Sequence, residues 1–585
     1  MASCPKCVSP ILTGLHDTVK RYATTPKKFE TTQTGTPFDC IIFILLLDPA
    51  CGSGNFLTET YISLRRLENE LLKEKYGVQI LMGDFDNPVK VSIGQFYGIE
   101  INDFAVAVAK AALWIAEALM LQETEEIVHR TIEFLPIQSY SHIVEGNALR
   151  MDWESVLPRD KCSYIMGNPP FVGNARLSDE QKQDRQKIFV GNGGDLDYVA
   201  CWYKKAADFM QGENIRCAFV STNSICQGQQ VTPLWQPLMN EGIKINFAYR
   251  TFVWDSESTL KAHVYCVIVG FSRQDLLPTF IYNDKQKIAA DNINGYLLNA
   301  PNIFVAKRKT PLCDVPQVIK GFQPTDNGYL ILDDNEKQEL LAQEPPAAEW
   351  IRPFISAKEY IHGKNRWCLW LTDMKPHILS KLTKIKERVV ACREWRLKQP
   401  KTGDAYKLRD IPMLMRPNGN FQEAPFIIIP LHTGENRRYI PFGFAAKGTI
   451  PGNSISLAIG ANSYHFGVLC SNVHMAWTRA VCGRLEMRYR YTSDLVYNNF
   501  PWPNPTDKQK ATIETTAQEI LDARKKYPDS SLADLYDPAS MPPELTKAHQ
   551  ANDRAVMAAY GFDVKSMTEA ECVARLMEMY VELTK

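Results

Sequence analysis

The sequence lacks an excess of charge of either sign, because 66 lysine and arginine residues balance 66 aspartate and glutamate residues. A balanced chain has no overall attraction for a polyanion, so any surface that binds nucleic acid must be local. The chain also lacks the roughly 20 consecutive apolar residues of a membrane helix. The run Ile41–Leu47 has only seven, and we interpret it as a buried parallel strand and expect no membrane contact.

The sequence also has no recognisable secretory leader and no cysteine framework. Its 15 cysteines are scattered, mostly within apolar stretches, which predicts reduced thiols and a cytoplasmic location. Cys4 and Cys7 have the spacing of a zinc knuckle, but no second pair of cysteines or histidines follows nearby. The sequence therefore predicts no metal site.

What is present indicates a folded protein of several units. The chain has 585 residues, of which 45% are hydrophobic and 10% aromatic, so two or three units with separate cores are expected. From about residue 41 to 275, strand-like runs alternate with the helical patterns Asn102–Leu121 and Asp197–Met210. This order is typical of an α/β unit with a parallel sheet and crossover helices. The predicted strands are Ile41–Leu47, Gln95–Ile99, His142–Val144, Ser163–Met166, Ile215–Ser221, Ile243–Tyr249 and His263–Phe271.

The pattern changes after Phe271, where prolines and short aromatic-rich segments become frequent, with turns such as Asn418-Gly419. We place a linker over 276–300 and a separate unit over 301–503. Helical periodicity returns in Asp507–Lys526, with Thr506 or Asp507 as the cap. Residues 504–585 are therefore expected to form a helical C-terminal segment.

A glycine-containing loop, Asp48-Pro-Ala-Cys-Gly-Ser-Gly-Asn-Phe56, follows the first predicted strand and precedes a helical segment. Its glycine pair, Gly52 and Gly54, permits a sharp turn and the close approach of a ligand. The third glycine of a dinucleotide fingerprint is absent, so nothing in the loop calls for a pyrophosphate. Taken alone, such a loop could equally serve packing.

Two further strand ends carry polar side chains that suit a nucleoside. Glu100 ends the next strand, where a carboxylate can accept both hydroxyls of a ribose. Asn147 follows the third strand, where its amide can hydrogen-bond an adenine edge. Because the carboxyl ends of parallel strands meet at one edge of a sheet, the three segments together predict a nucleoside site there.

The tetrapeptide Asn168-Pro169-Pro170-Phe171 follows the fourth predicted strand. Two prolines restrict the backbone, so the Asn168 amide and the Pro169 carbonyl are expected to form a rigid pair of acceptors. Two acceptors on one amino group orient its lone pair towards an electrophile, and the aromatic fourth residue can stack on a base lifted out of a duplex. Methylation of an exocyclic amine requires this arrangement and needs neither a metal nor a covalent intermediate.

Taken in order, these segments resemble a known family. DPACGSGNF, YGIEIN, GNALRMDW and GNPPF resemble the motifs of gamma-class amino-methyltransferases that act on adenine in DNA. Further along, the segments 194–198, 220–228, 252–254 and 262–265 resemble the single-polypeptide type II (type IIL or IIG) restriction-modification family, which fuses methylation with target recognition. The resemblance covers roughly residues 41–560. It implies a Rossmann-like, doubly wound α/β methyltransferase domain over 41–275, a mixed α+β target-recognition domain over 301–503, and then the helical segment.

The resemblance also implies S-adenosylmethionine as the cofactor and a role for each matched residue. The glycine loop would hold the methionine part of the cofactor, Glu100 with its neighbour Ile101 the ribose, and Asn147 with Ala148 would lie near the adenine. The loop residues so implied are Asp48, Pro49, Ala50, Cys51, Gly52, Ser53, Gly54 and Phe56. The target base would be held by Asn168, Pro169, Pro170 and Phe171.

The chain departs from the family at its start. In the family that the chain resembles, full-length members have a nuclease domain and a helical connector ahead of the methyltransferase. They also have an aromatic-Thr-Pro type segment that closes the cofactor pocket. About forty residues precede Asp48 here, and residues 1–40 match none of these parts. We therefore expect a chain that does not cut DNA by itself and whose cofactor pocket lacks a wall. A separate restriction nuclease is a further candidate partner.

Two arginine-rich segments are candidates for DNA contact, since basic residues neutralise phosphates and arginine reads guanine edges. Lys381–Arg409 has ten lysines and arginines against three acids, with Trp395 and Tyr406 between them. A solvated helix face would look the same. A second cluster lies beside Tyr489 and Tyr491. The candidate residues are Arg393, Arg396, Arg479, Arg484, Arg488 and Arg490.

The sequence thus predicts a monomeric, site-specific methyltransferase that modifies adenine-N6 in double-stranded DNA, within a restriction-modification or phage-defence system. Cytosine-N4 methylation uses similar chemistry and stays open. Methylation of a glutamine amide in a protein also stays open, although the arginine-rich second half argues against it. The unmatched N-terminus suggests a third hypothesis, an inactive DNA-binding remnant.

Overall fold

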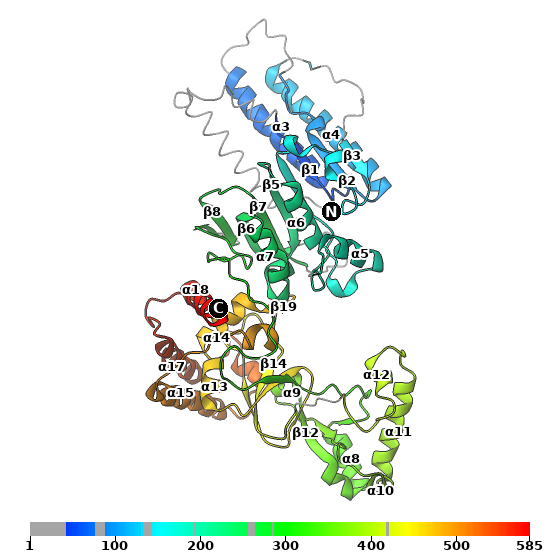
Figure 1. The fold of residues 1–585 in the computed structure, drawn as a ribbon, viewed down its shortest axis with the longest axis vertical. Helices are drawn as coiled ribbons and strands as arrows, with labels where there is room; N and C mark the ends of the chain where they lie inside the picture. Colours follow the sequence, from blue (N-terminus) through cyan, green and yellow to red (C-terminus); the bar gives the residue numbers. More distant parts are fainter. Residues whose placement is uncertain are drawn as a thin grey trace. The chain divides into compact units, whose positions relative to one another are not determined.

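The structure is a computed structural model, and it describes residues 43–76, 88–129, 131–132, 142–191, 193–254, 264–283, 286–416 and 421–585. Several expectations lie outside these residues: those for Cys4 and Cys7, for residues 1–40, for His263 and for the Asn418-Gly419 turn. The chain divides into two compact units, Met1–Phe304 and Val305–Lys585. Both are drawn in Figure 1, and each is described by itself.

One sheet of nine strands forms the centre of the first unit, in the order β3-β2-β1-β4-β5-β7-β6-β8-β9. Its strands are β1 (Leu46–Asp48), β2 (Phe96–Glu100), β3 (His142–Glu145), β4 (Tyr164–Gly167), β5 (Arg216–Thr222), β6 (Lys244–Trp254), β7 (Val264–Ser272), β8 (Thr279–Asn283) and β9 (Gln286–Ala290). The chain order reverses on either side of β1, with β2 to one side and β4 to the other. Ligands of doubly wound sheets bind at such a switch point, outside the carboxyl ends of the strands.

The predicted parallel sheet is correct for five strands and wrong for β7. The strands β3, β2, β1, β4 and β5 are all parallel to their neighbours, whereas β7 is antiparallel to both β5 and β6. A parallel crossover needs a dozen or more residues, and only nine separate Trp254 at the end of β6 from Val264 at the start of β7. The antiparallel pairing therefore follows from the length of the connection.

The linker expected over 276–300 also needs correction. This segment contains β8, which pairs in parallel with β6, and β9, which pairs antiparallel with β8. Ile281 and Ala290 are buried, so the segment belongs to the sheet. The first four residues of β9 are exposed, so this strand carries little apolar pattern in the sequence.

Helices cover both faces of this sheet. They are α3 (Asn55–Tyr76), α4 (Asp103–Val128), α6 (Ala200–Phe209) and α7 (Val231–Asn240), and a further helix, α5 (Asp179–Ile188), contacts α6. Helices α3 and α4 lie side by side (Figure 1) and share a buried core with β1, β2 and β4. Towards the other face, Tyr203 of α6 stacks on Phe271 of β7 at 5.3 Å between ring centroids. This confirms the doubly wound α/β arrangement.

Helix α4 is long and apolar enough to cross a membrane, by length and composition only, and is the one such helix among the described residues. Its Val106, Ala109 and Leu113 belong to the buried core shared with α3. The helix also connects the neighbouring parallel strands β2 and β3. We interpret it as the crossover helix of this sheet.

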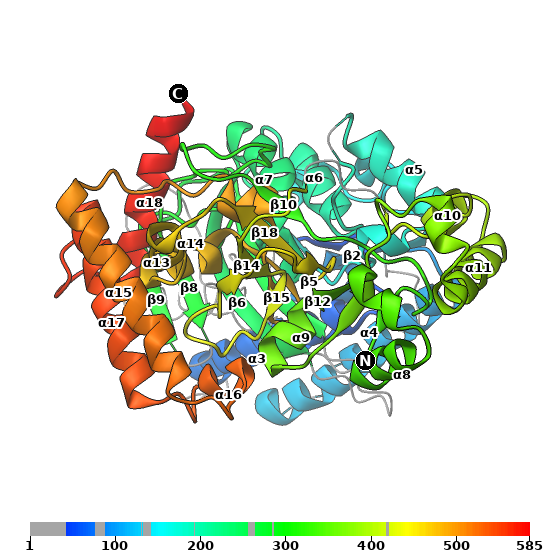
Figure 2. The same cartoon turned by 90° about the horizontal axis from the view of Figure 1, so that it is seen from below.

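The second unit contains three smaller sheets and many helices. The sheets are β10 (Val318–Lys320), β18 (Ile455–Ile459), β14 (Phe426–Pro430) and β16 (Gly443–Ala445); β11 (Ile331–Leu332), β13 (Trp367–Leu369), β12 (Ile351–Ile355) and β17 (Ile450–Pro451); and β15 (His432–Thr433), β20 (Arg488–Arg490) and β19 (Gly483–Leu485). The helices are α8 (Asp334–Gln343), α9 (Ala357–His362), α10 (Pro376–Leu379), α11 (Thr383–Leu397), α12 (Asp404–Lys407), α13 (Ser463–Leu469), α14 (Asn472–Val481), α15 (Asp507–Lys525), α16 (Leu532–Leu535), α17 (Pro543–Tyr560) and α18 (Glu569–Thr584). Figure 2 shows α15 and α17 side by side near the end of the chain.

Two of these helices bear on the sequence predictions. Helix α15 begins at the predicted place, and Thr506 is its cap, because its hydroxyl accepts the Gln509 backbone N–H. Helix α11 contains Arg396, one of the predicted DNA contacts. The Arg396 side chain is fully buried. Its guanidinium donates to five backbone carbonyls, those of Pro324, Thr325, Leu408, Ile411 and Leu414.

The burial of Arg396 contradicts the DNA-contacting role predicted for it. A buried guanidinium cannot reach a phosphate or a base, and its five donors are all used. In a sequence, a charge inside a basic segment looks the same whether it faces solvent or the core. Arg393, one turn earlier on α11, is exposed. Its contact with DNA stays a prediction.

Replacing Arg396 should therefore affect stability and not DNA binding directly. Arg396→Ala leaves several buried carbonyls without donors, so we expect the free energy of unfolding of the second unit to fall by about 3 kcal/mol or more. Arg393→Ala is the matched control, with an expected change within about 0.5 kcal/mol. Urea unfolding of both variants measures the difference. Equal stability of the two variants would contradict the assignment.

Candidate active site

The glycine loop leads from β1 into α3 and is shaped by two glycines with positive φ, 54° at Gly52 and 81° at Gly54. A β-carbon on Gly54 would lie 2.9 Å from the β-carbon of Ala109 in α4, so no side chain fits there. At Gly52 no heavy atom of the described chain lies within 4 Å of that position. The loop is thus packed against α4 on one side and open to a ligand on the other.

Glu100 holds this loop in place. One carboxylate oxygen, Oε2, accepts the Gly52 backbone N–H at 2.9 Å, and the other, Oε1, accepts the Asn102 N–H at 3.0 Å. A carboxylate has about four acceptor positions, so both oxygens can still accept from a pair of hydroxyls. The next residue, Ile101, is 67% exposed and offers an apolar surface beside the carboxylate.

Asp48 lies at the end of β1 and is buried, with only 1% of its surface exposed. Its Oδ1 accepts the Ala50 N–H at 3.0 Å, whereas its Oδ2 has no hydrogen-bond partner among the described residues. Burial raises the pKa of Asp48 to about 7; the Ala50 hydrogen bond opposes this rise and the nearby charge of Glu100 adds to it. The carboxyl is therefore a buried acceptor that an added cation or donor would stabilise.

The tetrapeptide begins directly beside this carboxyl. A β-carbon on Gly167, the last residue of β4, would lie 2.4 Å from the Asp48 Oδ1, so a glycine is required immediately before Asn168. The Asn168 Oδ1 is also buried without a hydrogen-bond partner among the described residues. Since β1 and β4 are parallel neighbours, two buried acceptors lie at adjoining strand ends. Buried polar groups left unpaired are rare, and a bound ligand, ion or water would account for both.

Phe171 of the tetrapeptide lies in a cluster with other partly buried aromatic residues. Phe171 packs against the buried residues Val220, Cys266 and Ile268, and so does Phe56. Four aromatic residues of β6 pack against the same three: Phe247, Tyr249, Phe252 and Trp254. Phe252 and Trp254 lie within one of the family segments of the sequence, for which no role is predicted there. The aromatic residues alternate with other residues along β6, and this pattern in the sequence could have indicated a stacking surface.

Asn147 is placed at the predicted strand end, but its side chain is already engaged. Its Nδ2 donates to the Asp184 Oδ2 at 3.2 Å, and its Oδ1 accepts the Leu149 N–H at 2.9 Å. Asp184 also accepts from Arg150 and Tyr198. Although burial alone would raise it, the hydrogen bonds from Arg150, Tyr198 and Asn147 hold the pKa of Asp184 below its usual value. The neighbouring Ala148 is buried, and its carbonyl accepts from Trp153.

The arginine cluster of the second unit is centred on the hairpin β19–β20. Arg488 and Arg490 are exposed; Arg488 pairs with Glu486 at 2.9 Å. The Arg484 guanidinium lies over the Tyr489 ring, 4.5 Å from its centroid. Partial burial, together with the charges of Arg490 and Arg488, lowers the pKa of His432 on the adjoining β15. The hairpin is thus a local region of positive potential.

Arg479 differs from the hairpin arginines. It lies on α14, where it forms an ion pair with Glu569 at 2.9 Å and donates to the Arg438 carbonyl at 3.2 Å. Its side chain is 28% exposed. Both terminal nitrogens of its guanidinium therefore donate within its own unit, and of the predicted DNA contacts the more accessible ones are Arg393, Arg488 and Arg490.

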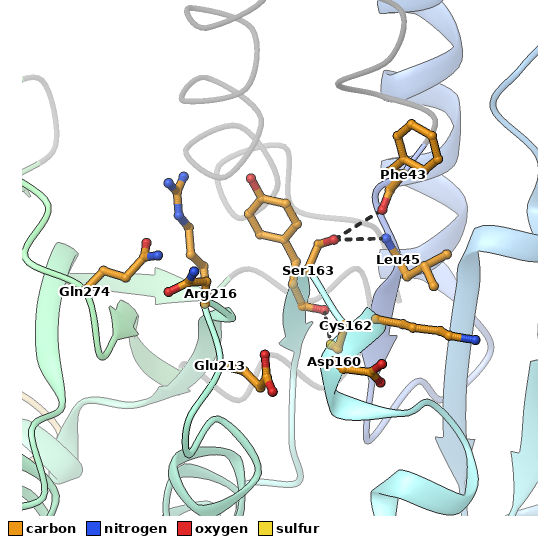
Figure 3. A pocket seen from close by; sticks show the side chains of 11 residues that line it. Phe43, Leu45, Asp160, Cys162, Ser163, Glu213, Arg216 and Gln274 are labelled. Atoms are coloured by element: carbon orange, nitrogen blue, oxygen red, sulfur yellow. Dashed lines mark hydrogen bonds between the residues drawn. The ribbon is translucent and has the colours of Figure 1, made fainter. Parts of the chain in front are cut away.

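A separate hollow of about 750 Å³ lies at the opposite edge of the sheet. Figure 3 shows Ser163 and Arg216 beside it, near the starts of β4 and β5, with Gln274 following β7. The predicted site residues are at the carboxyl ends of the same parallel strands. The hollow is therefore distinct from the candidate site. Over the described residues, no group of three histidine, cysteine or acidic side chains is arranged to hold a metal ion.

Comparison with known proteins gives matches over nearly the whole chain. Three family models match in succession: the MmeI DNA-methyltransferase domain over residues 38–283, the MmeI target recognition domain over 299–504 and the MmeI C-terminal domain over 505–585. DNA methyltransferase A of Bacillus subtilis (strain 168) is 38% identical over 548 residues, which cover 93% of this chain and 62% of that protein. The chain therefore spans less than two thirds of this curated relative.

A solved structure is also similar. The type IIL restriction-modification enzyme MmeI, determined in complex with DNA, matches with a TM-score of 0.87 and 38% sequence identity. The match covers 99% of this chain and 76% of that one.

The buried Asp48 suggests a pH-dependent affinity for the expected cofactor, whose methionine part carries an ammonium group. Only the ionised carboxylate pairs with that cation, and the pKa of Asp48 is about 7. Affinity for S-adenosylmethionine should therefore rise about eightfold between about pH 6 and about pH 7.5, as the ionised fraction of Asp48 rises. Isothermal titration calorimetry at the two pH values measures this change.

The control for this experiment is Asp48→Asn, which keeps the size of the side chain and cannot ionise. In this variant the affinity should be weaker and nearly the same at both pH values. A wild-type affinity that does not change with pH would refute the role of Asp48.

Proposed function

The chain belongs to the MmeI family of DNA methyltransferases with a target-recognition domain, and on that premise we propose that it transfers a methyl group from S-adenosylmethionine to the N6 amino group of adenine in a specific double-stranded DNA sequence. One observation carries the proposal. The oxygens Asp48 Oδ2 and Asn168 Oδ1 lie buried at the ends of the neighbouring strands β1 and β4, and neither has a donor among the residues that the structure describes. Two ligands with donor groups, side by side, would satisfy both.

The tetrapeptide would bind the amine that receives the methyl group. The Asn168 amide oxygen and the Pro169 carbonyl would accept the two protons of the target amine, which orients the nitrogen lone pair towards the methyl group. Phe171, held in the aromatic cluster, would stack on the extruded base. An exocyclic amine of a base is a weak nucleophile, and fixed acceptors favour its reacting geometry.

The glycine loop and the neighbouring strand end would bind the methyl donor. The carboxylate of Asp48 suits the ammonium of the cofactor, the open backbone at Gly52 admits the methionine part, and Glu100 suits the ribose hydroxyls. When bound, S-adenosylmethionine supplies an electrophilic methyl group on a sulfonium. Glu100 also fixes the loop through Gly52, so one carboxylate would both shape the pocket and bind the sugar.

Membership in a family with a target-recognition domain favours DNA over the glutamine amide of a protein as the substrate. The exposed arginines of the β19–β20 hairpin, together with Arg393 on α11, are our candidates for contacts to phosphates or base edges. We place the protein in a restriction-modification or phage-defence system of the cytoplasm and regard the monomer as its active form. Cytosine-N4 is the alternative target, because the Asn168 oxygen and the Phe171 ring suit either exocyclic amine.

The test of this proposal is the identity of the modified base. The purified chain, incubated with deuterium-labelled S-adenosylmethionine and bacterial DNA, should yield labelled N6-methyladenine on mass spectrometry of the digested nucleosides. Labelled N4-methylcytosine would correct the target base. Label found in a protein extract and absent from DNA would favour glutamine methylation. No label anywhere, with no binding of the cofactor, would favour the inactive remnant.

A second prediction separates the base site from the cofactor site. Asn168→Ala removes one of two acceptors for the amine, so kcat should fall by about 10²–10³-fold, whereas the affinity for S-adenosylmethionine should stay nearly unchanged. Single-turnover methylation and calorimetry measure the two quantities. Asn240→Ala, the same change at an exposed residue that ends α7, is the control. Equal losses of turnover and cofactor affinity would show that Asn168 acts elsewhere.

A further inference from the structure

We propose that Asp197 is a positioning residue that fixes the segment following the Asn168–Phe171 tetrapeptide, and thereby fixes the base-binding acceptors; this rests on the proposed function. Asp197 lies in the loop ahead of α6, and its side chain is directed to two other segments of the first unit. Neither of them adjoins it in the sequence. Its role would be to join the chain after β4 to the chain after β5.

The first step of the argument is the pair of contacts made by the Asp197 carboxylate. Its Oδ1 accepts the backbone N–H of Asn174 at 2.8 Å, three residues after Phe171. Its Oδ2 accepts the hydroxyl of Ser224 at 2.5 Å, in the turn after β5. The Ser224 hydroxyl lies 2.8 Å from that of Thr222. A single side chain thus connects the loops that follow two adjacent parallel strands.

Neighbouring bonds hold the same segment from other directions. The Tyr198 N–H donates to the Val172 carbonyl at 2.9 Å, and the Asp197 N–H donates to the Gln230 side chain at 3.0 Å. Arg185 donates to the side-chain oxygen of Asn174 at 2.6 Å and to the Leu196 carbonyl at 2.7 Å. Residues 172 and 174 are thereby anchored on both sides of Gly173.

The simplest alternative is that Asp197 caps α6, as aspartates near a helix start often do. The structure does not support this role. The cap position of α6 is Val199, and the helix start has no side-chain cap hydrogen bond. Both oxygens of Asp197 are used to hold other segments, so stabilising α6 does not account for them.

The consequence for the site follows from where the tetrapeptide is attached. On one side it continues from β4, a strand in the middle of the sheet. On the other side it continues into 172–173, which are in neither a helix nor a strand, and it depends on the bonds to Asn174 and Val172. Displacement of a reacting group by about 1 Å can cost about 10²-fold in rate. Releasing Asn174 should therefore loosen the Asn168 and Phe171 side chains without removing either.

The kinetic test compares Asp197→Ala with Asp197→Asn. The alanine variant should lose about 10²-fold in kcat, while the KM for DNA and the affinity for S-adenosylmethionine change by less than about threefold. The asparagine variant should recover most of the loss, because its oxygen can accept from Asn174 and its amino group can donate to the Ser224 hydroxyl. Asp179→Ala, an exposed aspartate of α5, is the matched control and should keep wild-type kinetics.

Hydrogen–deuterium exchange supplies a readout that does not depend on activity. In Asp197→Ala the backbone amides of residues 172–176 should exchange faster than in the wild type, with little change in β4 or α6. If the wild-type chain transfers no methyl group but this local change is found, the proposed function fails and the anchoring role of Asp197 stands. Unchanged exchange at 172–176, or wild-type kcat in Asp197→Ala, would overturn the inference. So would a loss of kcat that accompanies a general loss of thermal stability and that Asp197→Asn does not restore.

Discussion

Two buried oxygens, one on Asp48 and one on Asn168, have no donor within the described part of the chain, and they are the constraint on which the proposed site depends. An unpaired buried acceptor costs about 1–3 kcal/mol, so the surrounding fold must hold both in place against that cost. It does so with close contacts: Gly167 leaves room for the Asp48 carboxyl, and Gly54 lets the loop pack on α4. Glu100 then joins the loop to the start of α4 through two backbone N–H groups. Binding of two donor-bearing ligands would convert this cost into affinity.

The positions of these candidate residues in the fold could be predicted from the sequence because they follow consecutive strands. Glycine pairs, an acidic strand end and an Asn-Pro-Pro-Phe corner are local signals, and parallel strands bring their carboxyl ends to one edge. Pairings between distant residues could not be predicted. The Asn147–Asp184 bond, the burial of Arg396 and the Asp197 contacts join segments 12 to 72 residues apart. No local pattern encodes such contacts. The short β6–β7 connection, by contrast, was a local signal for an antiparallel strand.

The candidate residues for methyl transfer and for DNA contact lie in different units of the chain. The first contains the strand ends with the unpaired oxygens, and the second contains the exposed arginines of the β19–β20 hairpin and of α11. The charge balance of the whole chain fits this division, since a local cationic surface needs no overall positive charge. Arg396 shows why charge alone is a weak guide: the most basic stretch of the sequence contains a guanidinium that stabilises its own unit. Recognition residues are better sought among exposed arginines with few internal partners.

The most direct measurement is a structure of this chain bound to its DNA and to S-adenosylhomocysteine. The account predicts a base extruded from the duplex, with its amino nitrogen within hydrogen-bond distance of the Asn168 Oδ1, and a cofactor ammonium within the same distance of the Asp48 Oδ2. A cofactor ammonium bound away from Asp48, or a target base that contacts the protein elsewhere while Asn168 Oδ1 stays unpaired, would contradict it.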